Sequence, residues 1–566
     1  MRNKRIAAWF VFCLLLAAAP LIQGGPPFFS LTEVKPGQKG LGYTVPYGTE
    51  VKDFAVEILG VIQNKAKNRN FILVKVSGNI FRETKGIAAG MSGSPVFIDG
   101  RLAGAISYAF DRADPQYGLV TPVEDMLRLW ERDYRGGPLA LAPSPLLPFA
   151  GATAFPVLTP LLVSGSRVPP ELEQTAGRFG LKLVTAVETL GYDARTAPKL
   201  QPGSAVAAAF SLGDYNAVAI GTVTWLDGKR FLAFGHPVAN LGAVDYPATG
   251  AFIHRVIAST EMPFKIGVPL GSVGRFVQDR GAGASGVREE AADTVLVKAV
   301  VQDKDSGNRG TYQSAVASAP SLLRGMALAA LLDAMDQTLD QYAAGSARVT
   351  LRIEGEGLER TLVRRNLFQD GKDVAAAALS EVGEAIDLIV QNEFQPIRLR
   401  SIVLEVSFSP SPLSATVLKA RADRGQVRPG ERVKVDVELR PFRGAPYTVP
   451  FTVTVPENAA AGKLMLSIRG GLSRNREEQE GKQASFADLF TKKPGSLEEH
   501  ISAFVDRPHN NDLILEYLPF TRDEGDEDMD REPIVLIQGC DFVVMGETQV
   551  TLDVQAASAT EQEKAG

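Results

Sequence analysis

The sequence has few cysteines and few histidines, and each shortage narrows the class of protein that it can encode. Cysteine occurs twice, at Cys13 and Cys540. Because Cys13 lies in an apolar N-terminal run, a chain that has lost this run has no cysteine pair for an intrachain disulfide. Its domains must then be held together by their hydrophobic cores. Histidine occurs four times, so each histidine can be weighed separately as a catalytic base.

The sequence also lacks an excess of positive charge. Sixty basic and sixty-five acidic residues give a net charge of −5, which excludes the basic field of a nucleic-acid-binding protein. The composition, 45% hydrophobic and 22% charged, excludes a mostly disordered chain, a coiled coil and a polytopic membrane protein. There is no His-Glu-x-x-His run, which argues against a zinc peptidase, and we expect neither a metal nor a cofactor.

The N-terminus has the pattern of an export signal. The basic residues of Met1–Arg5 precede the almost wholly apolar run Ile6–Ile22, as in a secretory signal peptide. A small-x-small cleavage site is poorly developed after this run, so an uncleaved membrane anchor is the alternative. We therefore expect an exported protein, periplasmic or extracellular, with a membrane tether through this segment as the second interpretation.

Short β-rich runs bounded by glycine, aspartate and asparagine predict a mainly β protein with added helices. Apolar side chains recur at helical spacing in 328–339 and 379–390. Alternating apolar residues, clearest at Val433–Leu439, predict an immunoglobulin-like β-sandwich near the C-terminus. The expected segments are 1–25, a signal peptide or anchor; 28–135, a serine-bearing β module; 136–199, a connecting segment; 200–315, a histidine-bearing β module; 316–398, a helical and mixed segment; 399–475, the β-sandwich; and 476–566, a C-terminal extension.

The most informative motif is a glycine-rich turn around Ser92. Gly90-Met91-Ser92-Gly93-Ser94-Pro95 precedes an apolar strand, an Asp-Gly hairpin turn and a return strand. Small residues on both sides allow a serine to sit on a tight turn whose N–H groups point at one spot. The motif predicts Ser92 as a nucleophile, with the N–H groups of Gly90 and Ser92 as an oxyanion hole. A plain Gly/Ser turn is the alternative, whereas an α/β-hydrolase elbow would need glycine at position 94.

A serine nucleophile needs a base, and His236 is the best placed of the four histidines. It lies at the exit of a predicted hairpin with an Asp227-Gly228 turn, as expected of a base at a strand end facing a cleft. His254 lies in an apolar run typical of a core strand, and His500 and His509 belong to the C-terminal region.

The acid that would orient the imidazole is not selected by spacing. Asp245 is near His236 in sequence and is the first candidate, while a Ser–His dyad oriented by a backbone carbonyl or hydroxyl is an alternative. The other acidic candidates near the two motifs are Asp111, Asp114, Asp125, Asp214 and Asp227.

The residues from Gly86 to Ala109, continued by Phe110–Gly118 and Pro122–Leu127, resemble the SpoIVB family of sporulation serine peptidases. The segment Gly221–His236 is similar to that family's histidine motif. The resemblance implies a chymotrypsin-like double β-barrel, with Ser92 as nucleophile, His236 as general base and a protein or peptide as substrate.

The sequence departs from the family in three respects. The serine segment precedes the histidine segment, which predicts a permuted order of the two β modules. The family's acidic position falls on Ser77. The chain has no recognisable PDZ segment and carries a long C-terminal region. The leading hypothesis is an exported serine endopeptidase, and the alternative is a catalytically inactive, peptidase-like scaffold or binding protein of the cell envelope.

Overall fold

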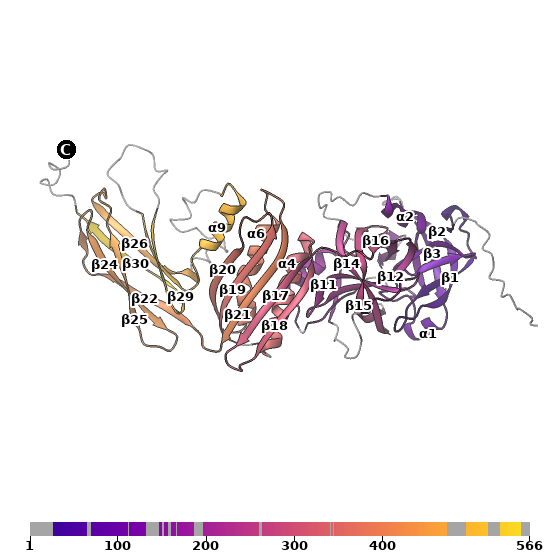
Figure 1. The fold of residues 1–566 in the computed structure, drawn as a ribbon, viewed down its shortest axis with the longest axis horizontal. Helices are drawn as coiled ribbons and strands as arrows, with labels where there is room; N and C mark the ends of the chain where they lie inside the picture. The colour runs from indigo at the N-terminus through magenta and orange to yellow at the C-terminus, as the bar shows by residue number, and fades with distance from the viewer. Residues whose placement is uncertain are drawn as a thin grey trace, which may run out of the picture.

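β-Strands dominate the computed structural model (Figure 1). Barrel strands lie at one end of an elongated molecule, followed by an open sheet with helices on one face and then by a β-sandwich. Among the described residues, no helix is both long enough and apolar enough to span a bilayer. The structure describes residues 27–64, 69–110, 113–131, 147–149, 152–156, 160–165, 167–185, 196–259, 263–339, 341–342, 344–472, 494–518 and 533–555. The predicted signal or anchor lies outside these ranges.

The first barrel carries Ser92. Its six strands pair in the order β4-β1-β2-β3-β6-β5, and a further pairing of β4 with β5 closes the ring. Apolar side chains of alternating residues fill its interior, among them Val56, Ile58 and Val74. The strands are β1 (Lys39–Thr44), β2 (Lys52–Asn64), β3 (Arg69–Ser77), β4 (Pro95–Ile98), β5 (Arg101–Phe110) and β6 (Tyr117–Pro122), with β7 (Leu147–Phe149) and β8 (Ala152–Pro156) beyond β5. Short helices flank it: η1 (Leu31–Glu33), α1 (Ile80–Thr84), α2 (Val123–Leu127) and η3 (Arg128–Trp130).

The second barrel carries His236. Its strands pair in the order β12-β13-β16-β15-β14-β11, and a pairing of β11 with β12 closes this ring as well. The strands are β11 (Ala205–Gly213), β12 (Ala217–Asp227), β13 (Arg230–Ala233), β14 (Gly242–Ile257), β15 (Phe264–Arg280) and β16 (Gly283–Arg288). β9 (Pro160–Val163) extends the sheet from β12, and β10 (Lys182–Thr185) follows it; α3 (Pro170–Arg178) packs nearby.

The middle of the molecule is an open sheet that continues from β11 of the second barrel in the order β18-β17-β21-β19-β20. Helices cover one face of this sheet and share its hydrophobic core (Figure 1). The strands are β17 (Thr294–Asp303), β18 (Arg309–Ala317), β19 (Gly345–Glu356), β20 (Leu362–Asp370) and β21 (Arg398–Ser409), and the helices are α4 (Pro320–Leu339), α5 (Val374–Ala378), α6 (Ser380–Val390) and α9 (Leu497–Asp506).

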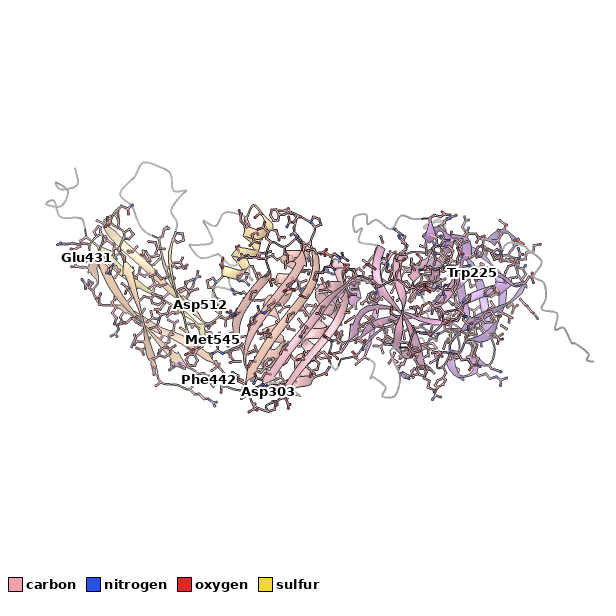
Figure 2. The ribbon with its side chains drawn as sticks, viewed as in Figure 1. Trp225, Asp303, Glu431, Phe442, Asp512 and Met545 are labelled. Atoms are coloured by element: carbon pink, nitrogen blue, oxygen red, sulfur yellow. The ribbon has the colours of Figure 1, made fainter. Side chains whose placement is uncertain are left out.

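The C-terminal part is a two-sheet β-sandwich with one hydrophobic core. One sheet has the order β25-β24-β22-β29 and the other β23-β30-β26-β27-β28. Figure 2 shows Asp512 and Met545 on the side of the sandwich that faces the middle sheet. The strands are β22 (Ser414–Ala422), β23 (Gln426–Val427), β24 (Arg432–Pro441), β25 (Tyr447–Thr454), β26 (Gly462–Gly470), β27 (Asp512–Tyr517), β28 (Ile534–Gly539), β29 (Val543–Met545) and β30 (Glu547–Val554).

The observed segments differ from the predicted ones at two boundaries. The histidine-bearing barrel ends with β16, because β17 and β18 pair into the middle sheet instead of the barrel expected over 200–315. The sandwich was expected over 399–475, but β21 belongs to the middle sheet and β27–β30, from the expected C-terminal extension, complete the sandwich. In both cases a strand's alternation was visible in the sequence, and its partner strand was not.

Candidate active site

Ser92 lies on a tight turn between α1 and β4. Gly90 and Gly93 have φ angles of 90° and 91°, a backbone region that L side chains rarely adopt. The Met91 N–H donates to the Ala88 carbonyl at 2.9 Å, and the Ser94 N–H donates to the Met91 carbonyl at 3.0 Å. These bonds fold the chain back on itself on both sides of Ser92, as the glycine pattern predicted.

The second barrel binds this turn through β12. The Thr222 N–H donates to the Ser92 carbonyl at 2.8 Å. The Thr224 hydroxyl donates to the Gly93 carbonyl at 2.8 Å and the Thr222 hydroxyl to the Gly90 carbonyl at 3.2 Å. Three hydrogen bonds therefore fix the serine turn of the first barrel against β12 of the second barrel.

Gly93 permits this close approach of the two barrels, and replacing Gly93 tests whether the contact is tight. A Cβ on Gly93 would lie 2.1 Å from the Thr222 carbonyl oxygen and 2.4 Å from the Phe234 nitrogen. Gly37 has nearly the same φ angle, 87°, but no atom within 4 Å of such a Cβ. We expect Gly93→Ala to lower the free energy of unfolding by about 3 kcal/mol more than Gly37→Ala, measured by urea denaturation. Equal losses would contradict a tight contact at this point.

The histidine segment is held in turn by the first barrel. After β13, Phe234 and Gly235 both have a φ angle of 68°, and this turn leads into His236. The Thr121 hydroxyl of β6 donates to the Gly235 carbonyl at 2.7 Å. The Tyr108 ring of β5 meets the His236 ring edge to face, with 6.2 Å between centroids. The second barrel thus positions the Ser92 turn, and the first barrel positions the segment that leads into His236. Both segments lie at the interface between the barrels.

The contacts of His236 determine its tautomer. Its Nδ1 lies 2.7 Å from the Pro237 carbonyl oxygen. Because a carbonyl only accepts hydrogen bonds, Nδ1 carries the proton in this contact and Nε2 is the basic nitrogen. The Pro237 carbonyl thus holds the imidazole ring. Ser92 and His236 are 0% and 2% exposed, so a substrate reaches them only if the surrounding structure moves.

Asp245, the first acidic candidate from the sequence, has other partners. It lies on β14, where one carboxylate oxygen is 3.2 Å from Nη1 of Arg275 and the other accepts the Asp293 N–H at 3.0 Å. Asp111 lies outside the described residues. The remaining candidates have these contacts: Asp114 accepts the Gln116 N–H, Asp125 pairs with Arg128, Asp214 accepts the Gln313 N–H, and Asp227 pairs with Arg230.

Asp279 was missed in the sequence and lies behind the histidine segment. Its fully buried carboxylate accepts the N–H groups of Val238, Ala239 and Asn240 at 2.8, 2.7 and 2.9 Å. Burial raises the pKa of Asp279 to about 6, and the backbone N–H groups oppose this rise. Asp279 therefore fixes the loop that begins at Pro237, whose carbonyl holds the imidazole. No spacing or motif marks it, because it is one of several polar residues along β15.

Replacing Asp279 should affect both stability and catalysis. In Asp279→Ala, three buried N–H groups lose their acceptor, which costs about 3 kcal/mol in the free energy of unfolding. We also expect hydrolysis to fall about tenfold or more, because the Pro237 carbonyl is no longer fixed.

Asp303 is a matched control for Asp279. This buried carboxylate accepts the Asp305 and Ser306 N–H groups at 3.0 and 3.3 Å. Figure 2 shows it at the lower end of the middle sheet's strands, far from Trp225 of β12. Asp303→Ala should lower stability without lowering hydrolysis by the folded protein. If both variants lose activity only in proportion to unfolding, Asp279 has no role in positioning.

The Gly90 N–H is a backbone donor suited to an oxyanion. Within the described part of the chain, no hydrogen bond uses the Gly90 N–H. The Gly90 N–H belongs to the peptide unit of the Ala89 carbonyl, which accepts the Lys265 N–H at 2.9 Å, so the direction of the Gly90 N–H is fixed. An N–H group that is fixed and not used internally matches the requirement for an oxyanion hole.

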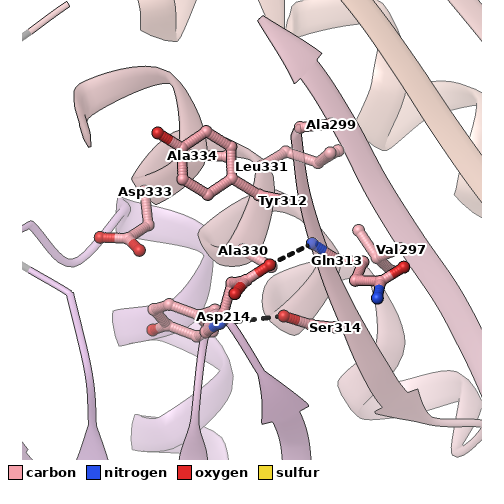
Figure 3. Close-up of a pocket in the computed structure, with 11 residues that line it drawn as sticks. Asp214, Val297, Ala299, Tyr312, Gln313, Ser314, Ala330, Leu331, Asp333 and Ala334 are labelled. Carbon is pink, nitrogen blue, oxygen red and sulfur yellow. Dashed lines mark hydrogen bonds between the residues drawn. The ribbon is translucent and has the colours of Figure 1, made fainter. Parts of the chain in front are cut away.

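A small cavity and a surface groove have no lining residue from the Ser92 and His236 segments. Figure 3 shows the residues that line a cavity between β17, β18 and α4, where Gln313 contacts Asp214 and Tyr215 contacts Ser314. The volume of this cavity is about 10 Å³. It is large enough for about one water molecule. A wide surface groove of about 940 Å³ lies on the first barrel, lined by β1, β4 and Gln201–Pro202.

The fold and the Ser92 turn are similar to those of a known class of protein. A mainly β chain with closed six-stranded barrels, and a Gly-x-Ser-Gly turn at their interface, is consistent with the chymotrypsin-like serine peptidases. Residues 27–127 match the family model of the SpoIVB peptidase S55, which confirms the resemblance over the first barrel and the Ser92 turn. His236 lies beyond the matched residues. No curated protein and no solved structure matches the chain.

Proposed function

We propose that the chain is an exported serine endopeptidase of the SpoIVB type, with Ser92 as nucleophile and His236 as general base. The observation that carries the proposal is the reciprocal contact at the barrel interface. β12 of the second barrel binds the Ser92 turn, and β6 of the first barrel binds the segment that leads into His236. The family match over residues 27–127 supports the same reaction class.

The proposed reaction is acyl transfer. As Ser92 Oγ bonds to the scissile carbonyl carbon, His236 Nε2 accepts its proton, and the carbonyl oxygen becomes an oxyanion facing the Gly90 and Ser92 N–H groups. The C–N bond then breaks, and the imidazolium gives its proton to the leaving amine. Water adds to the acyl group while His236 takes a proton from it. The C–Oγ bond breaks, the acid leaves and Ser92 recovers its proton.

Three finer features belong to the same proposal. The serine-bearing barrel precedes the histidine-bearing barrel, so the domain is a permuted chymotrypsin-like fold. The Pro237 carbonyl replaces the usual acid in orienting the imidazole, with Asp245 as the weaker candidate for that role. The C-terminal sandwich is of immunoglobulin-like type. The basic and apolar residues of 1–25 support export, with the protein free in the periplasm or outside the cell, or held at the membrane by this segment.

The experiment is a search for new internal termini in unfolded proteins incubated with the full-length chain. We expect cleavage products by mass spectrometry, and none with Ser92→Ala. A folded wild-type protein that yields the same termini as Ser92→Ala would contradict the proposal.

One observation favours a second candidate function. Ser92 is fully buried and His236 nearly so, which suits a closed, inactive barrel pair in an envelope scaffold or binding protein. In that case Ser92→Ala would remove only the small volume of one hydroxyl and would leave the function of the protein unchanged.

A further inference from the structure

A lysine is buried directly against the proposed oxyanion hole. Lys265 lies on β15 and is 0% exposed. Its N–H donates to the Ala89 carbonyl at 2.9 Å, so the strand runs beside the chain segment that enters the Ser92 turn. Carbons of its side chain lie 3.1–3.3 Å from the position that a Cβ on Gly90 would take. The aliphatic stem of Lys265 therefore packs on Gly90.

The charged end of this side chain has no acidic partner. Nζ donates to the Thr44 hydroxyl of β1 at 2.9 Å. Within the described residues, no carboxylate forms an ion pair with Lys265, and no other hydrogen bond uses its Nζ. Burial alone lowers the pKa of Lys265 to about 7. The groups that face it come from β1, the Ser92 turn and β14, and none of those identified is charged.

A buried ammonium without a counter-ion destabilises a folded protein, and an apolar side chain would fill the same space at no such cost. The presence of a lysine next to Gly90 therefore needs a reason other than packing. In a site shielded from water, a fixed positive charge stabilises negative charge that develops nearby far more than it would in solution. The position beside the Gly90 N–H is where that negative charge would form.

We propose that Lys265 is a positioning residue of the oxyanion hole: its stem supports the Gly90 turn, and its ammonium lowers the energy of the tetrahedral oxyanion. This inference rests on the proposed function. Lys265 does not act as the base, because Nζ is hydrogen-bonded to Thr44 and not to Ser92.

The test measures how fast the full-length protein reacts with a fluorophosphonate probe. In this reaction Ser92 Oγ bonds to phosphorus and fluoride leaves, so the phosphoryl oxygen occupies the same hole. We expect Lys265→Met to react about tenfold or more slowly at pH 6.5 while remaining folded. Lys304→Met, an exposed lysine of the middle sheet, should react at the wild-type rate. A Lys265→Met rate within about twofold of wild type would overturn the proposal.

The wild-type protein supplies an independent measurement if Lys265→Met does not fold. Its reaction rate should fall as the pH rises through about 7, because the ammonium loses its charge. A rate that only rises to a plateau would overturn the role of Lys265 and leave the peptidase proposal standing. Absence of probe reaction in the folded wild type, or equal reaction of Ser92→Ala, would instead overturn both.

Discussion

Replacing Ser92 or His236 by alanine should each lower hydrolysis by about 10³- to 10⁶-fold, and replacing both should lower it no further. The two groups perform one step, the transfer of a proton as a bond forms, so the loss of either one removes the contribution of both. Rates of peptide hydrolysis by the two single variants and the double variant measure this coupling. The activity that remains reflects substrate binding and the oxyanion hole.

The controls for this experiment are an exposed serine and a histidine elsewhere in the fold. Ser306→Ala alters the turn between β17 and β18, and His500→Ala alters α9. Both should hydrolyse peptide at the wild-type rate. Losses that multiply in the Ser92 and His236 double variant would mean that the two residues act independently, and the proposed mechanism would be wrong.

The second large effect is a gain of stability on removing a charge. Burial lowers the pKa of Lys265 to about 7, so the folded protein binds this proton more weakly than the unfolded chain does. The free energy of unfolding is therefore highest above the ordinary lysine pKa, where Lys265 is neutral in both states. This advantage is lost as the pH falls through 7, where the buried amine becomes charged. At pH 6, Lys265→Met should therefore raise the free energy of unfolding by about 3–5 kcal/mol.

Urea denaturation at pH 6 and pH 10 checks this expectation. The difference between Lys265→Met and wild type should shrink at pH 10, because the wild-type amine is neutral there in the folded state. Lys304→Met should change little at either pH. A lower stability of Lys265→Met at pH 6 would show that the ammonium is part of the structural framework. Together with slower probe reaction, higher stability would indicate that the protein retains this charge for its chemistry.

Local signals in the sequence predicted much of the fold correctly. The Asp-Gly pair after β4 forms the expected turn, with φ angles of 49° at Asp99 and 74° at Gly100. The helical periodicity of 328–339 is part of α4, and the glycines around Ser92 form the tight turn. Each of these depends on residues within a few positions of one another.

Features that depend on distant pairing were not predictable. The alternation in β21 indicated a strand, but its partners are β17 and β19 of the middle sheet and not the sandwich. Nothing in the sequence distinguishes Asp279 and Lys265 from the other polar residues of β15, and only the folded barrels bring them behind His236 and Gly90. The sequence placed His236 at the end of a hairpin, while the contact of its ring with the Pro237 carbonyl required the structure.

The most direct test is to map where a fluorophosphonate binds on the folded, full-length protein. Peptide mass mapping should find one phosphonyl group, on the peptide that contains Ser92, and its formation should slow by at least about a thousandfold in His236→Ala. An adduct on another residue, or none on a protein shown to be folded, would mean that the two barrels do not form a hydrolytic site.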